Sequence, residues 1–84
     1  MVMGAPAAAI VRRQKKIVAA FRAAGATSRE RATTGAALGV HEGLAFRILC
    51  RRAVLREAGE GRLYLDELEV RMRAQDRKLR ELEA

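Results

Sequence analysis

The fold of this chain is decided by the segment Val54-Leu-Arg-Glu-Ala-Gly-Glu-Gly-Arg-Leu-Tyr-Leu65. Two short strand-like stretches, 54–57 and 62–65, flank a four-residue turn whose glycines suit unusual backbone dihedral angles. This pattern predicts a β-hairpin. The rest of the chain is rich in alanine and charged residues and poor in aromatics, a composition typical of helical proteins. The predicted fold class is therefore mainly α with a small β-hairpin.

Helical periodicity marks the start of the chain. Apolar residues recur at helical spacing at Ile10, Val11, Ile17, Val18 and Phe21. They predict a helix over about residues 7–24, preceded by a frayed N-terminus at 1–6. Gly25 is a natural stop for this helix, because glycine readily adopts the left-handed conformation that ends many helices.

Two further helices are predicted before the hairpin. The run Thr27-Ser-Arg-Glu30 has the form of a capping box and predicts a short helix over about 28–38. The small Gly35 would let a neighbouring helix approach this helix closely. The tight turn Leu38-Gly-Val40 ends it, and a third helix follows over about 41–52.

The chain after the hairpin has the pattern of a coiled-coil helix. Asp66 is a suitable N-cap, with Glu69 three residues later, so a last helix is predicted over 66–84. With Leu65 at heptad position a, the next a and d positions form a seam of Leu68, Met72, Gln75, Leu79 and Leu82.

Charges beside the seam predict how two copies would pair. The e positions hold the acids Glu69, Asp76 and Glu83, and the g positions hold the bases Arg71 and Lys78. A parallel homodimer brings each g base to an e acid, whereas an antiparallel one brings like charges together. The tail therefore predicts a parallel homodimer. Because fewer than three heptads are present, the alternative is a solvated helix held by the internal pairs Glu67–Arg71 and Glu69–Arg73.

Positive charge is concentrated at the start of the chain. The net charge is +7 and the pI is near 11.0. Residues 1–26 hold five basic side chains and no acidic one. The basic stripe of the first helix is Arg12, Arg13, Lys15 and Lys16. It indicates contact with nucleic-acid phosphates. The alternatives are a plain solvated face or a helix that lies on anionic lipid.

Catalytic chemistry is not indicated by the sequence. The single histidine and cysteine, His41 and Cys50, are nine residues apart on one predicted helix, so they would face opposite ways. No cluster has metal-ligand spacing, and no cofactor motif is present. No apolar run is long enough to span a bilayer and no secretory signal is recognisable. We therefore expect a non-catalytic, cytoplasmic protein without metal or cofactor.

The order of elements from Thr27 to Leu65 resembles the winged helix-turn-helix superfamily. The residues that carry the resemblance are the cap Thr27, the small Gly35, the turn Leu38-Gly-Val40 and the hairpin 54–65. The resemblance implies a three-helix core with a hairpin wing over 7–65. With the C-terminal heptad helix 66–84 as a dimerisation helix, the layout is similar to that of small dimeric bacterial transcription regulators.

The resemblance also implies a DNA-reading surface. In DNA-binding members the second helix of the motif enters the major groove, and here that helix begins near His41. Gly43, Arg47 and Arg51 would face outward from it. Together with the basic stripe, the expected nucleic-acid-binding residues are Arg12, Arg13, Lys15, Lys16, His41, Arg47, Arg51 and Arg62.

Two features favour a second interpretation. The reading helix is apolar nearly all round, and the acid Glu60 lies at the wing tip, where phosphate would approach. The protein would then be an interaction and dimerisation module that does not bind DNA and that buries Leu44 and Ile48 against another protein. The sequence leaves both functions open.

Overall fold

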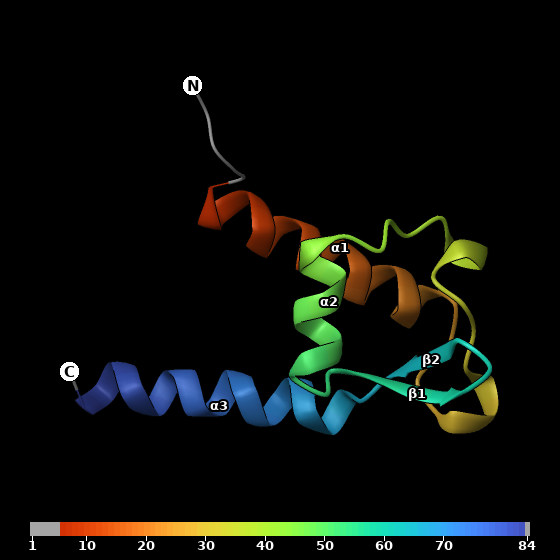
Figure 1. The fold of residues 1–84 in the computed structure, drawn as a ribbon. Coiled ribbons are helices and arrows are strands. Elements are labelled where there is room, and N and C mark those ends of the chain that lie inside the picture. The colour runs from red at the N-terminus through yellow and green to blue at the C-terminus, as the bar shows by residue number, and fades with distance from the viewer. Residues whose placement is uncertain (1–5, 84) are drawn as a thin grey trace.

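A computed structural model describes residues 6–83 of the chain (Figure 1). The elements are α1 (Ala7–Ala23), the 3-10 turns η1 (Arg29–Arg31) and η2 (Ala36–Leu38), α2 (Leu44–Arg51), the strands β1 (Leu55–Gly59) and β2 (Arg62–Leu65), and α3 (Glu67–Glu83). The mainly helical class with one antiparallel hairpin is confirmed. Of the predicted frayed segment 1–6, only Pro6 is described, and it is the residue that precedes the first turn of α1.

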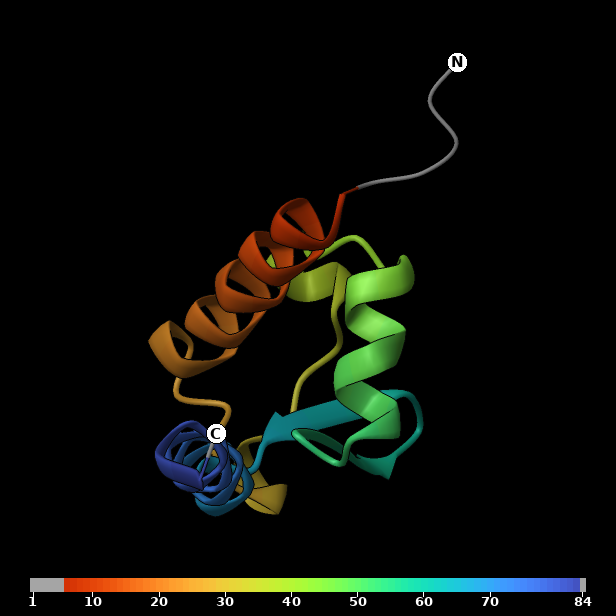
Figure 2. The same cartoon turned by 90° about the vertical axis from the view of Figure 1, so that its left-hand side faces the viewer.

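The core lies where the hairpin meets α1 and α2. Figure 2 shows these two helices as the sides of the domain, with the hairpin as its base. Phe21, Leu55 and Leu65 are the largest fully buried side chains. Leu65 therefore belongs to the core, and its assignment to the first a position of the seam is wrong. The seam begins at Leu68, because Leu65 is the last residue of β2 and its side chain is buried in the core.

The turns that follow α1 and α2 have the same hydrogen-bond pattern. After α1, Ala26 N–H donates to the Phe21 carbonyl at 2.9 Å, across Gly25 with φ of 72°. After α2, Val54 N–H donates to the Leu49 carbonyl at 3.0 Å. The left-handed residue of this second turn is Ala53, with φ of 61°. The predicted stop at Gly25 is thus confirmed, and α2 ends by the same motif with a less suitable residue.

Ala53→Gly should stabilise the protein by about 1 kcal/mol, because an L side chain is strained in the left-handed region and glycine is not. Urea denaturation followed by circular dichroism measures the change. The matched control is Gly25→Ala, which introduces the same strain after α1 and should lower stability by a similar amount. A lower midpoint for Ala53→Gly would contradict this account.

The predicted helix over 28–38 is wrong. This segment forms only η1 and η2, and between them Thr33 pairs with β2. Thr33 N–H donates to the Leu63 carbonyl at 2.9 Å, and Leu63 N–H donates back at 2.6 Å. β-Branched Thr33 and Thr34 followed by Gly35 form a poor helix, so the bridge to the hairpin prevails. The three-helix core is therefore reduced to α1 and α2 within residues 7–65.

The predicted capping box is also wrong. The N-cap of η1 is Ser28, which makes no side-chain cap bond, and Thr27 lies one residue earlier. The side chain that caps a turn is Thr34, whose Oγ1 accepts the Ala37 N–H at 3.1 Å. Gly35 does not face a helix packed on a helix as predicted, but it lies close to the start of α2: a Cβ there would lie 3.2 Å from Glu42 Oε2 and 3.4 Å from Cε2 of Phe46.

The hairpin turn is tighter than predicted. Leu55 pairs with Leu65 and Gly59 with Arg62, with a bulge between Glu57 and Gly59. Only Glu60 and Gly61 remain in the turn, and both have positive φ, 57° and 74°. Positive φ at both central residues is the property of a type I′ turn, whose twist matches that of the flanking strands.

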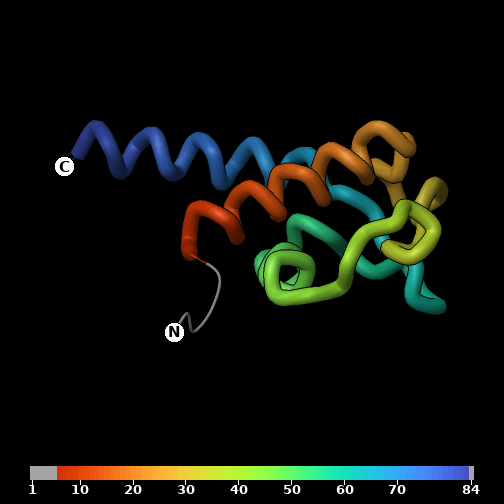
Figure 3. The backbone as a smooth tube through the Cα atoms, turned by 90° about the horizontal axis from the view of Figure 1, so that it is seen from above, coloured from red at the N-terminus to blue at the C-terminus, as the bar shows by residue number. Residues whose placement is uncertain are grey.

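The start of α3 is held to the rest of the domain by polar contacts. Glu69 N–H donates to Asp66 Oδ1 at 3.1 Å, which confirms the prediction that Asp66 is the N-cap of α3. The Arg22 guanidinium donates two hydrogen bonds to Glu67, at 2.7 and 2.8 Å. From Arg71 to Glu83 every residue is exposed, and Figures 1 and 3 show α3 projecting away from the domain. The helix is thus anchored at its first turn and exposed along the rest.

Asp66 should contribute stability that depends on pH. The Glu69 N–H, and after it the Arg56 guanidinium at 2.7 Å, lower the pKa of Asp66 from its ordinary value. Because the folded pKa lies below the unfolded value of about 3.9, this stability is present above that value and is lost as the pH falls through the folded pKa. Asp66→Asn keeps a capping oxygen but removes the charge, so it should cost about 0.5–1 kcal/mol at neutral pH, and the difference from wild type should shrink below about pH 4.

Denaturation midpoints from neutral pH to about pH 2 measure this effect. Glu81→Gln is the matched control, since Glu81 lies on the same helix, is exposed and forms no ion pair within residues 6–83. We expect the control to change stability by less than about 0.5 kcal/mol at any pH. A difference for Asp66→Asn that stays constant with pH would contradict the proposed charge effect.

Candidate nucleic-acid interface

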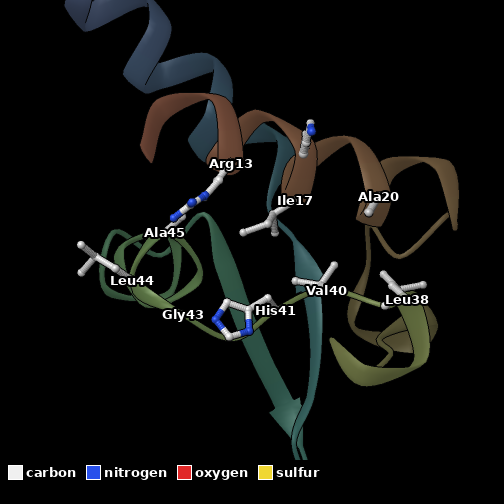
Figure 4. Close-up of a pocket in the computed structure, with 11 residues that line it drawn as sticks. Arg13, Ile17, Ala20, Leu38, Val40, His41, Gly43, Leu44 and Ala45 are labelled. Carbon is white, nitrogen blue, oxygen red and sulfur yellow. The ribbon is translucent and has the colours of Figure 1, made fainter. Parts of the chain in front are cut away.

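A groove of about 550 Å³ lies between α1 and the start of α2 (Figure 4). Its apolar lining residues are Ile17, Ala20, Leu38, Val40, Leu44 and Ala45. Its basic lining residues are Arg13, Lys16 and His41. Figure 4 shows Arg13 reaching from α1 toward Leu44 and Ala45, with His41 on the loop that leads into α2. We call this the α1–α2 groove.

Helix periodicity explains how α1 lines this groove. Ile17 is buried and turns toward the core, and Arg13 lies one turn before it. Lys16 is one residue from Ile17 and three from Arg13, so both bases lie along one flank of the buried stripe. Both are exposed. The groove therefore combines an apolar floor with positive charge on its α1 side.

The loop before α2 contributes His41. The predicted start of this helix near His41 is wrong, because α2 begins at Leu44 with Gly43 as its N-cap. Gly43 is half-buried, and a Cβ there would lie 2.8 Å from the His41 ring. Gly43 thus does not face outward as predicted but makes room for the imidazole, which is exposed at the groove edge.

The outer face of α2 is more mixed than predicted. Its buried residues are Ala45, Phe46 and Leu49, all on one side. Arg47 and Arg51 are exposed as predicted, but Leu44 is also 51% exposed and Ile48 is half-buried. The helix is therefore not covered all round, and it presents two guanidinium groups beside two apolar side chains.

The structure separates the basic residues that the sequence grouped together. Arg13 and Lys16 line the α1–α2 groove, whereas Lys15 lines a different groove, between α1 and α3. Arg12 lines neither of these grooves. Arg62, at the start of β2 next to the hairpin turn, is exposed and also lies outside both. Three of the eight predicted residues, Arg13, Lys16 and His41, therefore line one groove, and Arg47 lies about one turn of α2 beyond Leu44, which lines it too.

Electrostatics distinguish this face from the base of α3. Among residues 6–83, the ion pairs are Arg22–Glu67, Arg56–Asp66, Arg73–Glu69 and Arg80–Asp76. Each involves an acid of α3 or its cap. Arg13, Lys16, Arg47 and Arg51 form none within the described residues, so their charge is available to an external anion.

Among the described residues, the single histidine and the single cysteine lie in separate elements. His41 lies in a loop and Cys50 is half-buried on α2. Burial, and after it the charge of Glu42, raises the pKa of the Cys50 thiol, so it stays protonated and is a poor nucleophile. Within residues 6–83 no group of three or more His, Cys, Asp or Glu side chains could hold a metal ion.

The chain was compared with protein families, with curated proteins and with solved structures, and none of them matches it. No helix in the described part of the chain is long and apolar enough to cross a membrane.

Sequence reasoning missed the apolar floor of the α1–α2 groove. From the sequence, Leu38 and Val40 are only parts of a turn, and Ala20 is only part of a helix. A turn that carries two aliphatic side chains at alternate positions is a weak signal of partial burial. The signal does not reveal which helix these side chains meet, because that depends on the path of the chain between α1 and α2.

Proposed function

We propose that this protein binds double-stranded DNA without catalysing a reaction, as a homodimer joined through α3. The observation that carries the proposal is the convergence of two kinds of contact on one face. Arg13 and Lys16 of α1 line the same groove as the start of α2. The next exposed turns of α2 present Arg47 and Arg51.

The geometry gives each pair of basic side chains a different role in this proposal. Arg47 and Arg51 are four residues apart, so they lie along one edge of α2 about 6 Å apart along the axis. A helix of this width fits the major groove, where a guanidinium donates to guanine edges. Arg13 and Lys16, set back on α1, would contact phosphates and supply affinity without sequence preference. Exposed His41, at the edge of the same groove, would assist with phosphate.

The hairpin has a smaller role in this proposal than in the winged-helix resemblance. Glu60 occupies its turn, where a carboxylate repels phosphate. Arg62, next to the turn, would compensate in part. The resemblance is a hypothesis based on the order of elements.

Exposure of the seam supports the homodimer. Leu68, Met72, Leu79 and Leu82 are 60%, 55%, 53% and 82% exposed. Val70 and Ala74, by contrast, line the groove against α1. At 3.6 residues per turn the seam lies on the opposite side of α3 from Val70, so two copies can pair without disturbing either domain. An uncovered apolar stripe of this kind favours association.

Of the two internal ion pairs named above for a single solvated α3, one forms, and a third pair of the same spacing joins Asp76 and Arg80. Arg73 contacts Glu69 at 3.0 Å, whereas Glu67 is occupied by Arg22. Within the described residues Arg71 forms no ion pair, which leaves it available to Asp76 of a second copy. Asp76 is 3.1 Å from Arg80. On dimerisation it would replace this exposed ion pair with one to Arg71 of the second copy.

The DNA proposal predicts salt-dependent binding, and the salt dependence should distinguish two pairs of basic residues on α1. Random duplex DNA should bind at about 50 mM salt and weaken steeply as salt rises. The double variant Arg13→Ala, Lys16→Ala should make the plot of log association constant against log salt concentration less steep, by about 2 in slope. The matched control, Arg12→Ala with Lys15→Ala, removes the same charge from the same helix and should change the slope less.

Arg47→Ala with Arg51→Ala should instead reduce the preference for a selected site over random duplex. The expected reduction is about 1–3 kcal/mol for each arginine that reads a base, because the truncated side chain no longer donates to the guanine edge. Fluorescence anisotropy with labelled duplexes measures this preference and the salt slopes. If wild-type protein shows no binding at about 50 mM salt, the DNA proposal is wrong.

A second candidate function is a protein-interaction module, and one observation favours it. Leu44 is half-exposed at the edge of an apolar groove, next to partly exposed Ile48. These side chains would bury against a partner protein, with the basic charge serving solubility. The two candidates differ in the duplex titration, because only the first requires binding at low salt.

The homodimer proposal predicts opposite effects for two changes at the seam. Gln75→Leu should tighten association and loosen control of the oligomeric state, because it replaces the one polar layer. Arg71→Glu with Lys78→Glu should weaken the homodimer, since both would face acids of the partner. Sedimentation equilibrium measures both. Glu81→Lys, outside the seam and its flanking positions, is the control. A wild type that is monomeric at high micromolar concentration would contradict the proposal.

A further inference from the structure

A second groove, of about 320 Å³, runs between α1 and α3. We call it the α1–α3 groove. The bidentate pair of Arg22 and Glu67 joins the two helices at one end. Figures 1 and 3 show α1 and α3 diverging from that end toward the N-terminus of α1, so the groove opens there. It is lined by residues 11–22 of α1, by residues 49–54 and by residues 70–77 of α3.

The floor of this groove is aliphatic. Its apolar lining residues are Val11, Val18, Leu49, Val54, Val70 and Ala74. Leu49 and Val54 belong to the buried core, and Val18 and Val70 pack against it. Val11 is 46% exposed at the open end. The core of the domain therefore continues to the surface here and remains uncovered on the outer turn of α1.

The walls of the groove are basic. The charged lining residues are Lys15, Arg22, Arg52, Arg73 and Arg77, and among the described residues the lining contains no acid. Arg22 is paired with Glu67, and Arg73 contacts Glu69 and donates to the Arg52 carbonyl at 2.7 Å. Lys15, Arg52 and Arg77 form no ion pair within residues 6–83. Three parts of the chain thus contribute one available cation each.

We infer that the α1–α3 groove binds an acidic amphipathic helix of a partner protein. Apolar side chains of such a helix, repeating at i, i+3, i+4 and i+7, would occupy the valine floor. Carboxylates on its flanks would meet Lys15 on one wall and Arg77 on the other, with Arg52 at the end of α2. The occupant is a protein helix because an aliphatic floor gains nothing from phosphates or sugars, whereas the basic walls select against a neutral or basic helix.

This surface is separate from the other two. The seam lies on the opposite side of α3, so homodimer formation would leave the α1–α3 groove open. Arg13 and Lys16 line the α1–α2 groove, on the other flank of α1 from Lys15. The inference therefore goes beyond the DNA proposal and does not depend on it.

The test uses the full chain and a defined probe. The probe is a fluorescein-labelled peptide of leucine, glutamate and alanine, about four helical turns long, with leucines at i, i+3, i+4 and i+7 and glutamates beside them. The control peptide has the same composition in an order without helical periodicity. We expect the patterned peptide to bind with micromolar affinity, the control peptide to bind at least about tenfold more weakly, and both to weaken with salt.

Variants at exposed positions locate the binding. Val11→Glu and Arg77→Glu should each weaken binding of the patterned peptide by about tenfold or more, since each places an acid against the glutamates of the probe. The matched controls are Ala8→Glu, on the same helix as Val11, and Arg80→Glu, one turn along α3 from Arg77. Both controls lie outside the groove and should bind nearly as wild type does. Circular dichroism verifies that all four variants are folded.

Four outcomes would overturn the inference. The first is no binding of the patterned peptide, and the second is equal binding of both peptides. The third is competition by duplex DNA together with loss of DNA binding in Arg77→Glu, which would make the groove part of the nucleic-acid surface. The fourth is a change in self-association in Arg77→Glu without peptide, which would mean that a second copy occupies the groove. The double variant Arg13→Ala, Lys16→Ala should still bind the patterned peptide. Failure of the DNA proposal can therefore be distinguished from failure of the present inference.

Discussion

The packing of the hairpin against Phe21 is the constraint on which the rest of the structure depends. Phe21 comes from α1 and Leu55 and Leu65 from the two strands, and all three are fully buried. Removing one such side chain from a well-packed core costs about 2–5 kcal/mol, a large part of the stability of a domain this small. The hairpin also ties distant segments together: Leu65 N–H donates to the Ala26 carbonyl at 2.7 Å, and Asp66 N–H donates to the Val54 carbonyl at 2.8 Å. These two bonds set the point and direction at which α3 leaves the domain.

Both grooves follow from this arrangement. α1 is buried along one stripe, centred on Ile17 and Phe21, and each flank of that stripe borders a different element. One flank meets the loop before α2, and the other meets the first turns of α3. Because the basic side chains of α1 are distributed around its exposed surface, some of them line each groove. A single amphipathic helix can in this way supply cations to two separate surfaces.

Helices α1 and α3 and the hairpin were predictable because their signals are local. Gly25, Asp66 and the glycines around Glu60 act through backbone geometry or through hydrogen bonds that span only a few residues. The exposure of Arg47 and Arg51 also followed from periodicity alone. The error at 28–38 has the opposite origin: Thr33 pairs with the distant Leu63, and no local pattern reveals that partner.

The sequence by itself therefore determined the helix of α1, the hairpin, the cap of α3 and the apolar stripe along α3. Tertiary structure decided which surfaces those elements share. Leu65 has the spacing of a seam residue but is buried beside Phe21, because strand pairing places it in the core. Lys15 and Lys16 are neighbours in sequence yet line different grooves, while Lys15, Arg52 and Arg77 line the same one. The physical reason is that periodicity specifies which side of an element is apolar, whereas the partner of that side is chosen by long-range packing.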